Sequence, residues 1–428
     1  MLIPLHAATT PTCGPKAATL STLHNAGLPV PNAAIVPTTA FPPPTNTSPT
    51  APVDVGSSAD LLSEVLIFEL GAWLESIGDP PVAVRSSATN EDIAATSAAG
   101  QYDTFLGVQG LAAVTTAVRA CWSSLWSTRA TAYRTTDVQA LAMAVVIQEL
   151  VDAEVSGVMF TPADATGSTL IEASWGLGPS VVEGRLTPDS YEITADGSVT
   201  ATIADKPTAL YRTGSHVLEQ DVPADLRRTP TLSTETATQL AALGNQVTDL
   251  LGGPQDIEWA IANNQLWLLQ SRPITTPPPS TTRAAAPPAV LPGTIRAAAP
   301  PAAPHSTTRA AAALPGVAST PDAGSMLTGV PASRGTASGP VRVVRGPQDF
   351  ADVRPGDILV CRCTDPAWTP LLGIVAGVVT EVGGVLSHAA IVARERGIPA
   401  IVSVPAATTR LRNGTQITLD ATTGAVHL

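Results

Sequence analysis

His388 stands where a reactive imidazole is expected. It follows the glycine pair Gly383-Gly384 and then Ser387, in the stretch GGVLSHAAIVARERGIPAI. In the first turn of a helix, unpaired backbone N–H groups and the positive end of the dipole stabilise a phosphate and keep an imidazole neutral and nucleophilic. The glycines let a bulky anion approach the backbone. A structural histidine bonded to a neighbouring carbonyl fits this stretch equally well.

Charged and amide side chains also stand at the ends of two apolar strands. Arg85 closes the run VAVR, and an arginine leaving a buried strand needs an anion, for which a triphosphate is suited. Gly100 and Thr104 follow in a predicted turn whose backbone and hydroxyl donors can wrap phosphates, although an ordinary loop fits as well. Gln148 and Glu149 end the other strand, where Gln148 reads an adenine edge or is simply a polar strand end.

The stretch DIEWAIANNQLWLLQSRPIT predicts a hairpin with strands over 256–261 and 265–270. Glu258 and Gln270 then lie close across the pair as two oxygen ligands for Mg²⁺, with Arg272 just beyond for phosphate. A glutamate in an apolar strand is costly unless it is paired or metal-bound. This stretch therefore favours a metal and phosphate site.

Two α/β parts are needed to hold these residues. Residues 1–274 predict a first part, with strands over 82–85, 144–149 and 265–270 and helices over 61–76, 112–133 and 234–251. Residues 326–428 predict a second, smaller part of alternating strands and short elements. Within it, a buried strand over 375–382 and a helix over 389–396, with Ser387 as N-cap, present His388.

A Pro/Ala-rich stretch, residues 275–325, separates the two parts. It repeats RAAAPPA and cannot bury a core, which predicts a disordered linker. Such a linker is either a passive spacer or a tether that lets the second part travel, and shortening it to about ten residues tests the difference.

Composition bounds the remaining possibilities. A net charge of −12 without a basic run predicts no nucleic-acid partner. No apolar stretch is long enough to span a bilayer and the N-terminus lacks a signal-peptide pattern, so we expect a cytoplasmic protein without a membrane partner. The four cysteines are too scattered for a disulfide framework, and Cys361 with Cys363 is a minor candidate for metal binding.

Four stretches carry a family resemblance. VAVRSSATNEDIAATSAAGQYDTFL, IEASWGLGPSVVEGRLTPDSY and DIEWAIANNQLWLLQSRPIT resemble the ATP-grasp nucleotide domain of phosphoenolpyruvate synthase, pyruvate phosphate dikinase and rifampin phosphotransferase. GGVLSHAAIVARERGIPAI resembles the swivelling phosphohistidine domain of the same group. The resemblance implies an α/β (α+β) fold, with an ATP-grasp domain over 1–274 and a phosphohistidine domain over 326–428.

The resemblance also implies roles for individual residues. Nucleotide contacts are expected from Lys16, Arg85, Gly100, Thr104, Gln148, Glu149, Glu258, Gln270 and Arg272. Of these, Glu258 and Gln270 are expected to hold Mg²⁺, and Arg85 and Arg272 to act on the transferring phosphates. His388 is expected to carry the phosphoryl group, with support from Thr380, Gly383, Gly384 and Ser387.

The chemistry that the resemblance implies is a double displacement. His388 attacks the β-phosphate of ATP and AMP leaves; phosphate is then lost, and the remaining phosphoryl group moves to a hydroxyl-bearing small molecule, for which specialised metabolism is one option. We expect the family's third, acceptor-binding domain to be lacking. One alternative is therefore a phosphocarrier that serves a separate acceptor-binding protein. Another is an ATP-grasp ligase, which forms ADP and labels no histidine.

Overall fold

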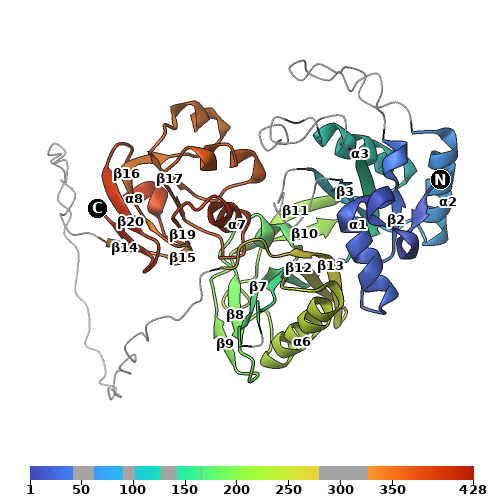
Figure 1. The fold of residues 1–428 in the computed structure, drawn as a ribbon, viewed down its shortest axis with the longest axis horizontal. Helices are drawn as coiled ribbons and strands as arrows, with labels where there is room; N and C mark the ends of the chain where they lie inside the picture. The colour runs from blue at the N-terminus through green and yellow to red at the C-terminus, as the bar shows by residue number, and fades with distance from the viewer. Residues whose placement is uncertain (42–61, 90–101, 126, 128–141, 165, 279–325) are drawn as a thin grey trace, which may run out of the picture.

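The computed structural model describes residues 1–41, 62–89, 102–125, 127, 142–164, 166–278 and 326–428. Figure 1 shows an N-terminal part in blue to yellow and a C-terminal part in orange to red that lies against it. Within the described residues, no helix is both long enough and apolar enough to cross a membrane.

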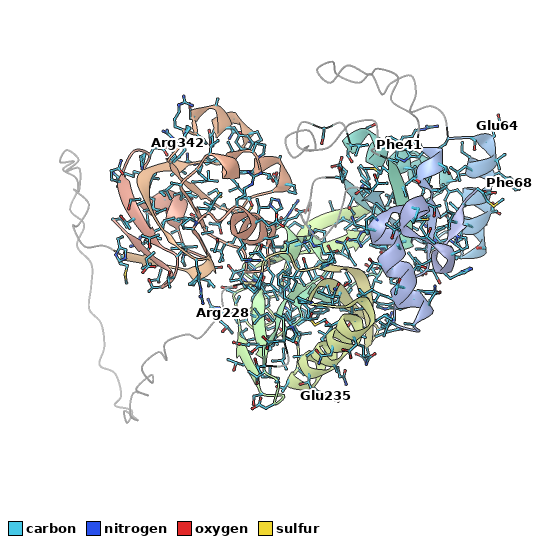
Figure 2. All side chains as sticks on the ribbon, viewed as in Figure 1. Phe41, Glu64, Phe68, Arg228, Glu235 and Arg342 are labelled. Carbon is cyan, nitrogen blue, oxygen red and sulfur yellow. The ribbon has the colours of Figure 1, made fainter. Side chains whose placement is uncertain are left out.

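The first sheet of the N-terminal part has the strand order β1-β2-β5-β3-β4. Its members are β1 (Ile3–Pro4), β2 (Ala33–Val36), β5 (Met143–Glu149), β3 (Val82–Ala88) and β4 (Thr104–Val108). Helix α1 (Thr10–Asn25) packs on this sheet, and α2 (Glu64–Ser76) and α3 (Leu111–Ser124) share a core with it. Burial is one-sided on α2: Leu66, Leu70 and Leu74 are buried, whereas Phe68 is exposed on the outer surface (Figure 2).

The second sheet has the strand order β13-β12-β6-β7-β8-β9 and is packed by α6 (Thr234–Leu251). Its strands are β13 (Gln265–Pro273), β12 (Gln255–Ala262), β6 (Val155–Phe160), β7 (Thr169–Trp175), β8 (Asp189–Ile193) and β9 (Val199–Thr202). A separate hairpin of β10 (Thr208–Thr213) and β11 (His216–Asp221) contacts β4. The short helix α5 (Pro179–Val182) follows β7.

The C-terminal part is built on one eight-stranded sheet with the order β14-β21-β20-β16-β17-β18-β19-β15. Its strands are β14 (Met326–Thr328), β21 (Ala425–His427), β20 (Gln416–Asp420), β16 (Thr336–Val343), β17 (Ile358–Cys361), β18 (Gly377–Thr380), β19 (Ala400–Val402) and β15 (Val330–Ser333). The pairs from β16 to β19 are parallel. The strands are connected by helices α7 (His388–Glu395) and α8 (Ala407–Arg410) and by the short 3-10 helices η4 (Pro347–Asp352), η5 (Pro366–Trp368) and η6 (Leu371–Gly373).

Most predicted elements are confirmed, and their ends are where the differences lie. The helix over 234–251 matches α6, and the helix after Ser387 begins one residue earlier than predicted, at His388 itself. The strand over 375–382 is shorter, because regular pairing of β18 stops at Thr380. The helix over 112–133 ends at Ser124 among the described residues.

One prediction about Thr104 is wrong. It does not lie in a turn: it is the first residue of β4, and its register partner is Arg85. Gly100 lies outside the described residues, so its predicted phosphate contact stays a prediction.

Candidate active site

A cavity of about 310 Å³ brings together most of the predicted nucleotide residues and the predicted phosphocarrier. It lies where the two sheets of the N-terminal part meet α7 of the C-terminal part. The predicted residues that line it are Lys16, Arg85, Thr104, Gln148, Glu149, Glu258, Gln270, Arg272 and His388. Residues as distant in sequence as Lys16 and His388 therefore share one site.

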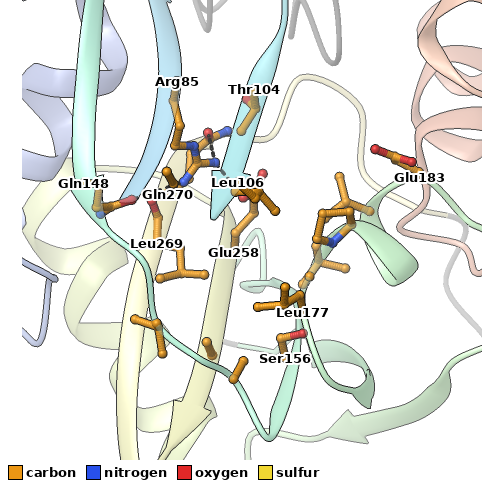
Figure 3. Close-up of a pocket in the computed structure, with 18 of the residues that line it drawn as sticks. Arg85, Thr104, Leu106, Gln148, Ser156, Leu177, Glu183, Glu258, Leu269 and Gln270 are labelled. Atoms are coloured by element: carbon orange, nitrogen blue, oxygen red, sulfur yellow. Dashed lines mark hydrogen bonds and ion pairs between the residues drawn. The ribbon is translucent and has the colours of Figure 1, made fainter. Parts of the chain in front are cut away.

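Arg85 is the centre of the polar network in this cavity (Figure 3). Its Nη2 donates to Glu258 Oε2 and to Gln270 Oε1, both at 2.8 Å. Its Nη1 donates to the Leu269 carbonyl at 2.8 Å and to Gln148 Oε1 at 3.4 Å. One guanidinium thus holds side chains from three strands in position.

The β12–β13 hairpin forms as predicted and positions Glu258 and Gln270 in this network. Asn263 and Asn264 form the turn with positive φ values of 52° and 59°, a conformation that asparagine tolerates. Glu258 is the register partner of Gln270, and the register shifts immediately after it. The shift leaves Leu269 without a partner residue on β12, and its carbonyl meets Arg85 instead.

The pKa values of two carboxyl groups on β12 are shifted in opposite directions. Burial favours a raised pKa for Glu258, but the positive charges of Arg85, Arg272 and Lys16 outweigh it and hold the pKa below its ordinary value. Burial raises the pKa of Asp256, although Arg272 Nη2 lies 2.7 Å from its Oδ2. Glu258 is therefore ionised and can offer an oxygen as a metal ligand, whereas Asp256 holds Arg272 in position through their ion pair.

Lys16 reaches the cavity because α1 is kinked. Gly14, with φ 73°, lies so close to β3 that a Cβ built there would meet the Ser87 carbonyl at 2.4 Å. The Ala17 N–H donates to Ser87 Oγ at 3.3 Å. This close packing of helix on strand brings the buried Lys16 beside the Arg85 network.

Two buried polar atoms of this cavity have no protein partner among the described residues. They are Nε2 of Gln148 and Nε of Arg85. Such atoms are rare in protein interiors and indicate room for a polar ligand. Glu149 accepts from Asn32 at 3.1 Å, which anchors it at the edge of the same cavity.

His388 is the first residue of α7 and is buried, with 4% of its surface exposed. Its Nδ1 atom is fully buried. Its Nε2 lies 3.5 Å from Thr369 Oγ1, which also donates to the Pro366 carbonyl at 2.8 Å. Sequence reasoning missed Thr369, because nothing in the segment around η5 links it to the histidine helix.

The residues predicted to support a phosphohistidine contact backbone groups of their own loop. Thr380 Oγ1 donates to the Val382 carbonyl at 2.6 Å, and Ser387 Oγ donates to the Gly384 carbonyl at 2.8 Å. Ser387 is the N-cap of α7 as predicted, but its side chain accepts no capping hydrogen bond. These contacts shape the loop, and a direct contact with the ring or its phosphate stays a prediction.

Gly384 faces the N-terminal part directly. A Cβ built on it would lie 2.0 to 2.3 Å from the Glu172 carboxylate. That carboxylate accepts from the N–H groups of Val385 at 2.6 Å and Leu386 at 3.2 Å. We call this contact between the two parts the docked arrangement.

A charged and apolar seam surrounds the docked loop. Burial raises the pKa of Glu172 to about 7, while hydrogen bonds from Leu386 and Val385 and the charge of Arg394 oppose the rise. Burial also lowers the pKa of Arg394 to about 10. An apolar cluster bridges the parts alongside: Val158, Phe160 and Val181 from one, Val385, Leu386 and Ile391 from the other. The segment around Glu172 carries part of the family resemblance, but the sequence did not predict the contact of Glu172 with the C-terminal part.

The structure shows no metal-binding cluster at the cysteine pair within its described residues. Cys361 is buried at the end of β17, and both Cys361 and Cys363 are free thiols. The described residues contain no group of three or more His, Cys, Asp or Glu side chains that could hold a metal ion.

Fold and cavity define the class of protein: an ATP-grasp-like part joined to the histidine-bearing mobile part of enzymes that use phosphoenolpyruvate. The AMP/ATP-binding domain of pyruvate phosphate dikinase matches residues 59–288, and the mobile domain of PEP-utilising enzymes matches residues 353–424. The chain belongs to this family.

Named relatives agree with that assignment. A probable phosphoenolpyruvate synthase of Methanothermobacter thermautotrophicus is 36% identical over 377 residues, which cover 86% of this chain and 50% of the relative. The phosphoenolpyruvate synthase of Pyrococcus furiosus is 36% identical over 364 residues, 81% of this chain and 41% of the relative. The prodigiosin synthesizing transferase PigC of Serratia marcescens is 39% identical over 279 residues, 61% and 31% respectively. The chain thus spans about half or less of the length of these relatives.

Proposed function

We propose that this chain carries out the phosphohistidine half of a dikinase-type phosphotransfer, using ATP as the phosphoryl donor and a hydroxyl-bearing small molecule as the acceptor. The observation that carries this proposal is that His388 lines the same cavity as Arg85 and Arg272. A nucleophile and phosphate-binding guanidiniums in one buried site match the needs of phosphoryl transfer, in which positioning and charge stabilisation supply most of the rate.

The cavity suits a nucleoside triphosphate. Lys16, Arg85 and Arg272 would bind the phosphates, and the Thr104 hydroxyl beside Arg85 would add a donor. The amide of Gln148, with its unbonded nitrogen, would read the base edge. On this proposal an incoming nucleotide takes over hydrogen bonds that the side chains now make to one another.

Glu258 and Gln270 suit a magnesium ion. Their oxygens accept from the same Arg85 nitrogen at 2.8 Å, so they lie close enough to act on one cation. Magnesium is commonly held by one or two protein oxygens together with substrate phosphates. When bound, the ion would neutralise developing charge on the phosphates.

The proposed reaction runs through the Nε2 atom of His388, because Nδ1 is fully buried. Nε2 attacks the β-phosphorus, the bond from that phosphorus to the oxygen shared with AMP breaks, and AMP leaves with the electron pair. The ring keeps its proton on Nδ1, so that a neutral imidazole can leave in the last step. Water then removes the terminal phosphate as inorganic phosphate. The acceptor hydroxyl attacks the remaining phosphorus, loses its proton to water, and the imidazole leaves.

The relatives' names bear on the acceptor. Phosphoenolpyruvate synthases suggest an acceptor that becomes phosphoenolpyruvate, and the prodigiosin synthesizing transferase suggests one from specialised metabolism. A second candidate function is a phosphocarrier that passes the phosphoryl group to a separate acceptor-binding protein. The close contact of Gly384 with Glu172 supports this carrier function in one respect. It shows the loop that bears His388 packed against a surface outside its own part of the chain.

Product analysis tests the proposal. The purified chain incubated with Mg-ATP should release AMP, and His388 should take its label from the β-phosphate. ADP as the sole product, with no labelled histidine, would identify a ligase instead. Turnover of a small-molecule acceptor by the chain alone would exclude the carrier function.

A further inference from the structure

A second cavity, of about 500 Å³, lies between the two parts beside the first. Arg185 lines it from the N-terminal part, and Arg345, Arg362 and Thr364 line it from the C-terminal part. Glu183 lines both cavities, so the two adjoin. Nothing in the dikinase chemistry above uses the second cavity.

Its place in the fold is one where ligands commonly bind. Arg345 follows strand β16, Arg362 and Thr364 follow β17, and Glu381 follows β18. These three strands are parallel neighbours, so the cavity lies outside their carboxyl ends. In open α/β sheets, ligands bind in the crevice at that edge.

Thr364 supplies an independent sign of a ligand. The residue is 2% exposed, and its hydroxyl has no hydrogen-bond partner within the described part of the chain. A buried hydroxyl without a partner is unfavourable and therefore rare. A ligand that accepts a hydrogen bond from Thr364 would remove that cost.

The cavity lining carries three arginines and four carboxylates, so the case for an anion rests on the arginines that have no carboxylate partner among the residues described. Arg345 and Arg362 form no ion pair with any described residue, whereas Arg185 lies 2.5 Å from its partner Glu183. Two unpaired guanidiniums near a hydroxyl donor are suited to a carboxylate or phosphate.

Carboxylates also line this cavity, but most of them already accept hydrogen bonds or form an ion pair within the protein. Glu381 accepts from the N–H and the hydroxyl of Thr408 at 2.7 and 2.5 Å. Asp365 accepts from the Ala367 N–H at 2.7 Å. Glu219, on the exposed strand β11, is the carboxylate that faces the cavity without such a bond.

We propose that this second cavity binds a small molecule bearing an oxyanion, a carboxylate or a phosphate, through Arg345, Arg362 and Thr364. Arg185 lies across the cavity on the other part, so a bound anion links the two parts and stabilises the docked arrangement. The oxyanion comes either from the acid group of the phosphoryl acceptor or from inorganic phosphate. The site itself does not depend on phosphohistidine chemistry.

Binding measurements on the full chain test this proposal. With the first cavity filled by a non-hydrolysable ATP analogue and Mg²⁺, inorganic phosphate and glycerate are titrated separately by calorimetry. We expect at least one of them to bind saturably. Arg345→Gln and Arg362→Gln should each weaken that binding about tenfold, Thr364→Val about threefold, and the exposed control Arg412→Gln should leave it unchanged.

Each outcome decides a point. Binding of phosphate alone assigns the site to inorganic phosphate, and binding of glycerate alone assigns it to an acceptor acid. The proposal is overturned if neither anion binds saturably. It is also overturned if the Arg345→Gln and Arg362→Gln variants bind the anion as tightly as the unaltered chain does. His388→Ala should bind the anion normally, so this result is separable from a failure of the proposed phosphotransfer.

Discussion

The Glu172 carboxylate of the N-terminal part accepts a hydrogen bond at 2.6 Å from the backbone N–H of Val385, in the loop that leads to His388. One carboxylate thereby ties the loop that leads to His388 to the N-terminal part. The same group accepts from Leu386 and lies against Gly384. The docked arrangement therefore depends on a buried carboxyl group placed against backbone, which gives it a pH dependence and a tight steric limit.

Removing that carboxylate should weaken docking without affecting the nucleotide site. Glu172→Ala leaves the N–H groups of Val385 and Leu386 without their acceptor, and each buried donor left without a partner costs about 1–3 kcal/mol. We expect labelling of His388 by ATP to slow at least tenfold at pH 6, with ATP affinity unchanged. Quench-flow labelling measures the rate, and the exposed Glu235→Gln provides the control. Labelling at the unaltered rate would show that the contact is incidental.

The contribution of Glu172 should fall as the pH rises. Its pKa is raised from 4.5 to about 7 in the docked arrangement, chiefly by burial. The docked state therefore holds this proton more tightly than an exposed glutamate does, and its stabilisation is complete below about pH 4.5 and lost as the pH rises through about 7. The labelling rate of the unaltered chain divided by that of Glu172→Ala should decrease from pH 5 to 7, by up to roughly tenfold per pH unit. Above pH 7 this ratio should stay level. A ratio that stays constant or increases over this range would contradict the assignment.

A methyl group at Gly384 should block docking sterically. The Cβ of Gly384→Ala would lie 2.0 to 2.3 Å from the Glu172 carboxylate, so we expect labelling by ATP to fall at least a hundredfold. In a Glu172→Ala background the obstacle is gone, and adding Gly384→Ala should then cost less than threefold. Equal losses in the two backgrounds would mean that the glycine serves phosphate access and not docking.

The magnesium requirement should depend on Glu258. Nearby Arg85, Arg272 and Lys16 keep this carboxyl ionised despite its burial, and Glu258→Gln removes the charge while keeping an oxygen ligand. We expect the Mg²⁺ concentration for half-maximal labelling to rise about tenfold, since charge dominates the binding of hard cations. The unaltered response to Mg²⁺ would argue that the ion is held by phosphates alone.

Patterns within single strands and hairpins predicted most of the fold and much of the site. The hairpin of Glu258 and Gln270 could be predicted because turn residues and strand alternation fix cross-strand neighbours locally. The helix beginning near His388 could be predicted because glycines and an N-cap serine define its start.

Contacts between segments that are distant in sequence could not be predicted in this way. Glu172 meets Val385, and Thr369 meets His388, only through tertiary packing that leaves no periodic signal. The turn assigned to Thr104 was wrong for a related reason: pairing of β4 with Arg85 on β3 extends the strand further than local composition indicates. The glycine pair was interpreted as space for an anion, whereas Gly384 also makes space for a neighbouring carboxylate.

The most direct test of the proposed function is transfer of radiolabel from β-³²P-ATP to the chain. We expect an acid-labile, base-stable label on His388, formed together with AMP, and no label on His388→Ala, which should still bind ATP. An unlabelled histidine in the unaltered chain, or AMP formed equally well by His388→Ala, would contradict it.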